Sequence, residues 1–261
     1  KTLFLHDFFK QIENCDSTYQ HPDIHIYYQP IWDEGEKVFN SIEILSRISY
    51  GEELIYPEEF IPFALKNGYL CYYNRFVFDK ACSEFADILK NDDSNIKIMS
   101  MNFSVQEILK PHFTRSIIET LRKYEIPKHK IAIEIIESSN TTKIEEIKDV
   151  ILKLKQYGIK VYLDDFGTEY SNFDRILYWP VDVIKVDKHL TWSMRNNDTV
   201  QPIIKGVISS LNKAGYKILF EGVETEEDLE KCKQMNATYL QGFHYSKPIN
   251  YNNLLQFLNI A

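Results

Sequence analysis

Five apolar, β-branched runs of the chain each end in an acidic residue, a lysine or an amide. They are IAIEIIE (Glu134, Glu137), VYLDD (Asp164, Asp165), VIKVD (Lys185, Asp187), ILFEGVE (Glu221, Glu224) and YLQG (Gln241). The first polar groups of successive runs lie 30, 21, 36 and 20 residues apart, about the length of a strand, a helix and their loops. A parallel barrel gathers such strand ends on one face. Converging acids repel one another unless cations lie among them, so the pattern predicts bound divalent metal.

The adjacent residues Asp164 and Asp165 form the sharpest local signal. Neighbouring strand residues point to opposite sides, so both carboxylates can serve one site only where the strand ends. A pair of helix N-cap residues is the alternative, because aspartate caps helices well. Glu134 lies inside a β-branched run, where a carboxylate is either paired or coordinated.

The remaining polar residues each have an ordinary structural explanation. Lys185 is open to a simple ion pair with Asp187, and Asn102 and Gln241 are typical of core amides that form hydrogen bonds. A purely structural interpretation would have to explain six such residues at the same mouth of the barrel, none of them histidine. They are Asn102, Glu134, Asp164, Asp165, Lys185 and Glu221. Ligands that offer only oxygen favour magnesium, calcium or manganese over zinc.

Composition narrows the class of protein. The 261 residues suit one α/β barrel, and the 44% apolar content is ample for its core. The net charge of −8 and the absence of a Lys/Arg-dense stretch argue against binding duplex nucleic acid. Four scattered cysteines, no signal peptide and no apolar run of membrane length predict a cytoplasmic domain without membrane contact of its own. The chain opens on Lys1 rather than Met, so we expect a domain of a longer protein, which could itself be membrane-anchored.

Hydrophobic periodicity predicts the elements that position these residues. In the first half of the chain we expect an opening helix over 2–13, strands over 25–31 and 37–48, helices over 57–68 and 70–90, a strand over 96–104 and a helix over 111–124. The first two strands flank a turn at 33–36 and must be antiparallel, because a parallel return needs a longer crossover.

Helix-start signals organise the second half. Thr142 and Glu145 form a capping-box pattern ahead of a helix that ends at Gly158. Asp198 can cap a helix that Gly215 ends, and Thr225 starts another. No linker divides these units, so we predict one domain: residues 1–22 as the opening helix and lead-in, 23–250 as the barrel and 251–261 as a C-terminal helix.

Seven motifs in this order make the chain resemble an EAL domain, the family of cyclic di-GMP phosphodiesterases. The matching segments run from residues 29–31 to 246–248. They are Glu43-Ile44-Leu45 with Arg47, Asn102-Phe103-Ser104, Glu134 to Glu137, Asp164 to Gly167, Lys185 to Asp187, Glu221 to Glu224, and Gln241-Gly242. The resemblance implies a TIM-like (β/α)8 barrel modified by an antiparallel first strand, in agreement with the hairpin expected from the turn.

The resemblance also implies roles for individual residues. Metal ligands would be Glu43, Asn102, Glu134, Asp164, Asp165 and Glu221, with Asp164 bridging two ions; Glu43, Lys185 and Glu221 would be catalytic. Gln29, Leu45, Arg47, Asp187 and Gln241 would bind substrate, and Glu137 and Glu224 would support loops. The general base, Glu221 or an activated water, stays open.

The implied function is hydrolysis of cyclic di-GMP to the linear dinucleotide pGpG by two ions of magnesium or manganese, with calcium binding but inhibiting. A homodimer is implied as well. The main alternative is an EAL-like receptor or interaction module that is weakly active or inactive. An enolase-like barrel fits less well, because such enzymes need a sizeable capping domain and only 42 residues precede Glu43.

Two departures from the family pattern bear on activity. Ile44 replaces an alanine, and Glu169 and Asn172 stand where the family has glycine and serine. If the backbone at 169 needs a positive φ, glutamate there costs about 1 kcal/mol or more. We expect any effect on activity or its regulation to arise in this loop rather than in the ligand set.

Overall fold

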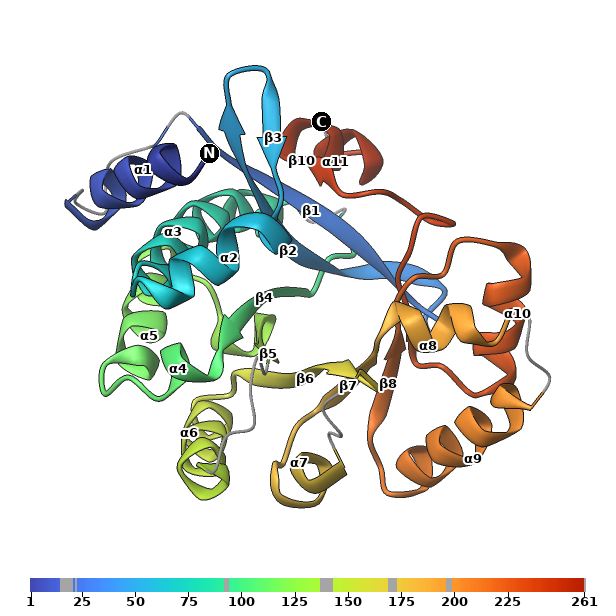
Figure 1. Cartoon of the computed structure of the whole chain (residues 1–261). Helices are drawn as coiled ribbons and strands as arrows, with labels where there is room; N and C mark the ends of the chain where they lie inside the picture. Colours follow the sequence, from blue (N-terminus) through green and yellow to red (C-terminus); the bar gives the residue numbers. More distant parts are fainter. Residues whose placement is uncertain are drawn as a thin grey trace.

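The computed structural model describes residues 1–14, 21, 23–91, 94–136, 143–168, 173–195 and 199–260. In this part of the chain eight strands close into a barrel in the order β1, β2, β4, β5, β6, β7, β8, β9 (Figure 1). Their bounds are β1 Ile24–Asp33, β2 Val38–Tyr50, β4 Ile98–Ser104, β5 Ile131–Ile136, β6 Lys160–Phe166, β7 Val183–Val186, β8 Lys217–Phe220 and β9 Tyr239–Leu240. Two short strands extend the sheet: β3 (Glu53–Ile55) pairs with β2, and β10 (Ile249–Asn250) with β1.

The strand β1 runs antiparallel to both of its barrel neighbours, β2 and β9. All other neighbouring pairs of the barrel are parallel. The predicted fold, a barrel with an antiparallel first strand, is therefore confirmed. The carboxyl ends of seven strands consequently face the same mouth, while β1 ends at the other.

Helices cover the outside of the barrel (Figure 1). They are α1 Thr2–Asn14, α2 Pro57–Lys66, α3 Leu70–Leu89, α4 Val105–Ile108, α5 Phe113–Lys123, α6 Ile144–Gln156, α7 Phe173–Tyr178, α8 Lys188–Ser193, α9 Val200–Lys213, α10 Glu226–Gln234 and α11 Tyr251–Phe257, with a 3₁₀ turn at Lys128–Lys130. The expected helices agree with these bounds to within a few residues. Thr225 caps α10, its hydroxyl accepting from the Asp228 N–H at 3.1 Å. The expected caps Thr142 and Asp198 lie outside the described residues.

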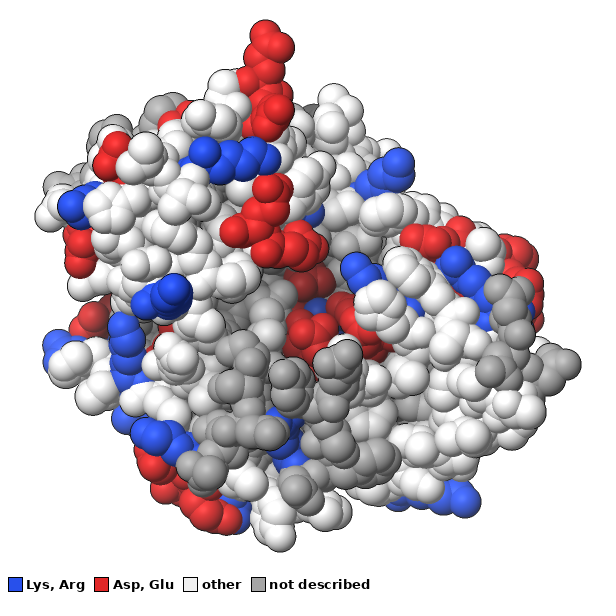
Figure 2. Space-filling view, viewed as in Figure 1, with Lys and Arg blue, Asp and Glu red and all other residues white. Residues whose placement is uncertain are grey.

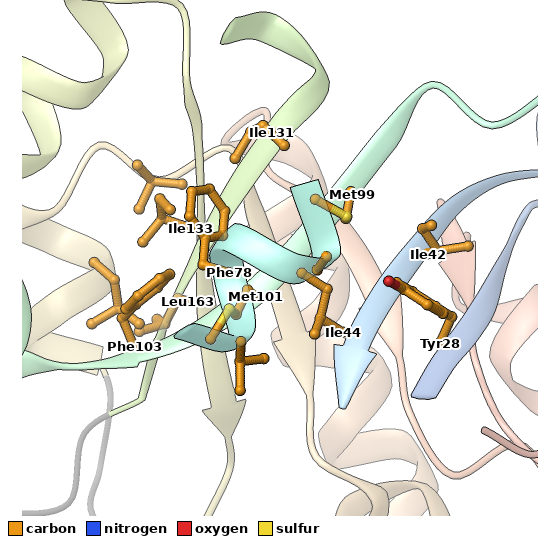
Figure 3. Packing of buried hydrophobic residues seen from close by; sticks show 14 of the residues in the cluster. Tyr28, Ile42, Ile44, Phe78, Met99, Met101, Phe103, Ile131, Ile133 and Leu163 are labelled. Carbon is orange, nitrogen blue, oxygen red and sulfur yellow. The ribbon is translucent and has the colours of Figure 1, made fainter. Parts of the chain in front are cut away.

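Alternation along the strands divides the apolar residues into two layers. The outward layer packs against the helices, and Figure 3 shows part of it, including Ile133, Met101 and Phe103 beside Phe78 of α3. The inward layer fills the barrel and consists of Ile31, Ile98, Ala132, Tyr162, Val183, Leu219 and Tyr239. Side chains two positions apart on a strand share a face. The residue two positions beyond an inward apolar residue therefore also points into the barrel.

The substitution Gly242→Ala tests the close packing at the end of β9. A Cβ at this position would lie 2.0 Å from the carbonyl oxygen of Val223 and 2.4 Å from its nitrogen, so backbone must move. We expect a loss of about 1–3 kcal/mol in the free energy of unfolding, measured by denaturant titration. Gly206→Ala is the control: it lies within α9 with nothing within 4 Å, so it should gain about 0.5–1 kcal/mol. Equal unfolding midpoints for the two variants would contradict this account.

Candidate functional site

A buried lysine gathers four carboxylates from four other strands or strand ends. The Lys185 side chain is 0% exposed. Its Nζ lies 2.5 Å from Glu134, 2.8 Å from Glu221, 3.1 Å from Asp164 and 3.4 Å from Glu43. Acidic side chains gather in a hollow near the centre of the face drawn in Figure 2. The predicted convergence of distant acids is thus present in the fold.

Strand alternation explains why these side chains meet. Each follows an inward apolar residue by two positions: Glu134 follows Ala132, Asp164 follows Tyr162, Lys185 follows Val183 and Glu221 follows Leu219. Paired positions are offset by two residues, since Glu134 lies opposite Tyr162 and Lys185 lies opposite Leu219. This stagger is that of a tilted barrel, in which inward residues of neighbouring strands form layers. The apolar layer is the floor of the site, and the charged layer is the site itself.

Two amides hold Glu43 from both sides. The Asn102 Nδ2 donates to Glu43 Oε1 at 2.8 Å, and the Gln241 Nε2 donates to Glu43 Oε2 at 2.6 Å. Gln241 also donates to Gln29 Oε1 at 3.2 Å, and Gln29 donates to the Ser246 carbonyl at 3.2 Å. Asn102 and Gln241 therefore use their amide nitrogens to hold Glu43, and their amide oxygens remain available to another partner.

The donor set fits hard cations. The buried atoms Asn102 Oδ1, Glu134 Oε1 and Gln241 Oε1 have no hydrogen-bond partner. A buried oxygen without a partner is costly, so such atoms call for an explanation. Oxygens of Asp164, Asp165 and Glu221 also lie within 4.8 Å of one another. Carboxylate and amide oxygens are the ligands that Mg²⁺ and Mn²⁺ prefer.

The backbone at Asp165 explains how two adjacent carboxylates serve one site. Asp165 adopts a positive φ of 56°, and the pairing of β6 with β7 shifts register between Leu163 and Phe166. Regular alternation is broken there, which brings the Asp165 carboxylate beside that of Asp164. The alternative of a helix N-cap pair is wrong, because both residues lie within β6.

The alternative ion pair between Lys185 and Asp187 is also wrong. The Asp187 carboxylate caps α8 instead, accepting from the His189 N–H at 2.8 Å. Lys185 forms its ion pairs with the four acids of the cluster. A substrate contact of Asp187 stays a prediction.

The substrate residues predicted on β2 continue the face that carries Glu43. Leu45 and Arg47 follow Glu43 at intervals of two, so their side chains share its side of the strand. The Arg47 guanidinium lies 4.8 Å from the ring centre of Tyr56 and 5.9 Å from that of Tyr27. Sequence reasoning missed both tyrosines, because nothing in the spacing of residues 27, 47 and 56 shows that they meet.

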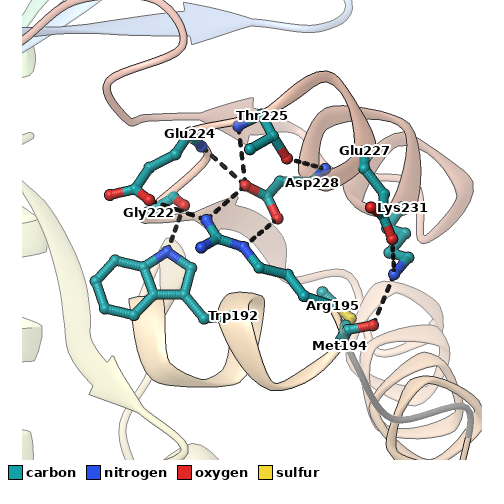
Figure 4. Close-up of polar contacts among 9 residues, drawn as sticks. All are labelled: Trp192, Met194, Arg195, Gly222, Glu224, Thr225, Glu227, Asp228 and Lys231. Atoms are coloured by element: carbon teal, nitrogen blue, oxygen red, sulfur yellow. Dashed lines mark hydrogen bonds and ion pairs between the residues drawn. The ribbon is translucent and has the colours of Figure 1, made fainter.

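An arginine clamp supports the segment that carries Glu221 (Figure 4). Arg195 pairs with Glu224 at 3.0 Å and with both oxygens of Asp228 at 2.8 Å. Asp228 in turn accepts from the N–H groups of Glu224 and Thr225 at 3.0 and 2.9 Å. The Trp192 indole donates to the Gly222 carbonyl at 2.9 Å. Glu224 thus has a place in a loop-holding network. Glu137, Glu169 and Asn172 lie outside the described residues.

The comparison with protein families gives a clear match. The sequence model of the EAL domain matches residues 13–248. The chain belongs to the EAL domain family. No helix in the described part of this EAL domain has the length and apolar character needed to span a membrane.

Curated relatives are longer than this EAL domain. The signaling protein YkoW of Bacillus subtilis is 25% identical over 234 residues, covering 89% of this chain and 29% of its own length. The cyclic di-GMP phosphodiesterase PdeL of Escherichia coli is 26% identical over 230 residues, with coverages of 88% and 63%. The cyclic di-GMP phosphodiesterase PdeA of Borreliella burgdorferi is 29% identical over 224 residues, with coverages of 85% and 33%. The chain spans less than two thirds of the length of each.

Solved structures share the fold. The PaMucR phosphodiesterase in complex with c-di-GMP superposes with a TM-score of 0.85 at 23% identity, covering 96% of this chain and 99% of that one. The FimX EAL domain from Pseudomonas aeruginosa bound to c-di-GMP gives 0.81 at 19% identity, with coverages of 95% and 96%. The barrel of this EAL domain is therefore the family's barrel.

Burial shapes the protonation of the cluster. Burial, reinforced by Glu43, raises the pKa of Glu134 well above its usual range, and burial raises that of Asp164 too. Burial raises the pKa of Asp165 to about 7 and that of Glu221 to about 8. Burial alone would lower the pKa of Lys185, but the surrounding carboxylates hold it well above its usual range. Without cations, Asp165 and Glu221 therefore retain protons near neutrality.

Divalent cations are expected to raise the melting temperature, and more at pH 8 than at pH 6. Carboxyl groups with raised pKa values hold protons at pH 6, and a cation must displace them. The metal-free protein, conversely, gains stability as the pH falls from about 8 towards the ordinary carboxyl pKa, because the folded state binds more protons than the unfolded chain. Saturation at roughly a hundred times Kd corresponds to about 2.7 kcal/mol.

Scanning calorimetry with Mn²⁺ or Mg²⁺ against an EDTA baseline measures this shift. The variant Asp164→Asn should lose most of it. A shift of equal size at the two pH values, or an undiminished shift in the variant, would contradict the assignment of cations to these acids.

Removal of the arginine clamp should destabilise the loop. Arg195→Gln leaves the buried Asp228 carboxylate without its ion pair, at an expected cost of about 2–4 kcal/mol in the free energy of unfolding. Lys231→Gln is the control on α10, because Lys231 pairs with the exposed Glu227 and the Met194 carbonyl rather than with the 221–225 segment. Denaturant titration compares the two variants, and a larger loss for Lys231→Gln would speak against the clamp.

Proposed function

We propose that the chain is a metal-dependent phosphodiesterase that hydrolyses cyclic di-GMP to linear pGpG. The observation that carries the proposal is the buried lysine among four acids with orphaned oxygens beside them. Membership of the EAL family supports it, as do relatives named as cyclic di-GMP phosphodiesterases. Structural neighbours with c-di-GMP bound support the choice of ligand.

The charge of the site suits an anionic substrate only with cations present. Five carboxylates (Glu43, Glu134, Asp164, Asp165 and Glu221) and the ammonium of Lys185 leave four net negative charges when fully ionised. Two divalent cations would neutralise them and so permit a phosphodiester to approach. Bound in such a pair, the cations would supply water activation and charge stabilisation for an in-line displacement.

The residues of the chain hold the reacting groups and move the proton. The two amides at Glu43 and the ammonium of Lys185 fix the carboxylates in position before substrate arrives. The Lys185 ammonium would also contact the nucleophilic water. Glu221 lies 2.8 Å from the same ammonium, and in its ionised form, once cations have displaced its own proton, it is placed to accept a proton from that water.

The rim on β2 would bind the rest of the substrate. Arg47 presents a planar cation beside two tyrosine rings, which suits a phosphate oxygen or a guanine face. Leu45 would contact the guanine base of the substrate, and Gln29 and Gln241 would bind the substrate beside Glu43. Asp187 and Glu137 keep their proposed roles in substrate binding and loop support.

The choice of cation follows from coordination chemistry. Magnesium and manganese accept six oxygen ligands in compact geometry, whereas calcium is larger and takes six to eight at longer distances. We therefore propose that magnesium or manganese supports turnover and that calcium binds but inhibits. A homodimer and a cytoplasmic location complete the proposal and rest on family membership.

Product analysis tests the function. The protein is incubated with cyclic di-GMP and Mg²⁺, Mn²⁺ or Ca²⁺, and the linear product is followed by chromatography. We expect pGpG with the first two cations, and Glu43→Ala should lower turnover by at least about a hundredfold because it removes a ligand and the anchor of both amides.

Glu119→Ala is the matched control, since Glu119 is an exposed partner of Arg115 on α5. Its turnover should stay unchanged. Full turnover in Glu43→Ala would refute the ligand assignment. Binding of cyclic di-GMP without product would establish the alternative, a receptor.

A further inference from the structure

The mouth of the barrel opposite the acids carries lysines in a repeated pattern. On three strands a lysine precedes the site acid by four residues, in the segments Lys130-Ile-Ala-Ile-Glu134, Lys160-Val-Tyr-Leu-Asp164 and Lys217-Ile-Leu-Phe-Glu221. The lysine, the central apolar residue and the acid have the same strand parity, so each segment forms one inward column. The central residues Ala132, Tyr162 and Leu219 belong to the buried interior layer. Each column is therefore basic at one end, apolar in the middle and acidic at the other.

The basic ends line a pocket of about 330 Å³. Lys160 and Lys217 are the first residues of β6 and β8, and Lys130 directly precedes β5. Asp33 reaches the same pocket because β1 runs antiparallel and ends at this mouth. Tyr239 of β9 contributes its hydroxyl, which lies 3.4 Å from the Lys217 ammonium.

The acids of this pocket are engaged elsewhere. Asp33 accepts from the N–H groups of Gly35 and Glu36 at 2.9 and 2.8 Å and from the Asn40 amide at 2.7 Å. Glu36 pairs with Lys97 at 2.6 Å. Asp33 thus closes a turn and Glu36 pairs with Lys97. Neither carboxylate forms an ion pair with the three lysines of the columns, which we call the column lysines.

The three column lysines have no acidic partner of their own. Within the part of the chain that the structure describes, Lys130, Lys160 and Lys217 form no ion pair with a carboxylate. The site acids of the same columns lie about 13 Å away along the strands, beyond the reach of an ion pair. Burial, together with the charge of Lys217, lowers the pKa of Lys160. Lys217 is exposed and Lys130 and Lys160 are half-buried, so an anion from solution can reach these ammonium groups.

We propose that this basic mouth binds a compact polyanion, namely the phosphate groups of a small phosphorylated molecule. Ammonium groups and a tyrosine hydroxyl suit phosphate oxygens, which accept several charge-assisted hydrogen bonds at once. The volume suits a small ligand rather than a macromolecular surface. The net charge of −8 disfavours an extended nucleic acid. The apolar layer separates this mouth from the acidic site, so the two mouths would bind different ligands.

Calorimetric titration of the full chain with inorganic pyrophosphate tests the proposal. The buffer contains EDTA, so pyrophosphate cannot reach the acidic site through bound cations, and the result does not depend on phosphodiesterase activity. We expect saturable binding with one equivalent. The double variant Lys160→Gln/Lys217→Gln should weaken it by at least about tenfold, because two charge-assisted contacts are removed.

Two further variants make the test specific. Lys160→Arg/Lys217→Arg keeps both charges and should retain binding, which separates loss of charge from loss of fold. Lys205→Gln/Lys213→Gln removes the same charge from exposed positions of α9 outside the pocket and should bind as the unmodified chain does. Failure to saturate, or equal weakening in both glutamine variants, would overturn the proposal.

Discussion

The site depends on one interaction, the burial of a single ammonium among four carboxylates. Charges of one sign repel strongly where solvent is excluded, and burial of each also costs hydration. Lys185 offsets part of that cost by contacting Glu134, Asp164, Glu221 and Glu43 together. Burial, and after it the remaining repulsion between the carboxylates, raises the pKa values of the acids. Such a cluster is stable as a binding site for cations and unfavourable as a permanent set of bare charges.

A closed barrel is the scaffold that can hold this arrangement. Each strand is hydrogen-bonded on both sides, so the inward residues cannot move apart to relieve repulsion without breaking the sheet. The apolar layer below excludes water from the floor, and the outer layer against the helices fixes the strands from outside. Beyond the ends of the strands, side-chain contacts hold the site in place. The amides of Asn102 and Gln241 hold Glu43 at one edge, and the Arg195 clamp holds the segment after β8.

The same alternation that builds the acidic mouth also orients the basic one. A strand that crosses the barrel presents one face inward throughout, so its first and last inward residues occupy opposite mouths. Asp33 belongs to the basic mouth for the complementary reason, because β1 alone runs the other way. The barrel is consequently polarised along its axis, with cations and anions favoured at opposite ends.

The sequence by itself determined the order of elements, the hairpin that makes β1 antiparallel and the residues that end each strand, because these follow from local periodicity and spacing. It also indicated that the acidic side chains meet at one site, since the carboxyl ends of the parallel strands of a barrel lie at the same mouth. Only the tertiary structure decided how the charges pair. Lys185 joins four distant acids rather than Asp187, Asp165 turns into the site through a positive φ, and Arg195 meets Asp228. The ion pairs join residues far apart in the chain, and the position of Asp165 depends on one backbone torsion. The local pattern of apolar and polar residues reveals neither the pairing of distant residues nor the torsion of a single one.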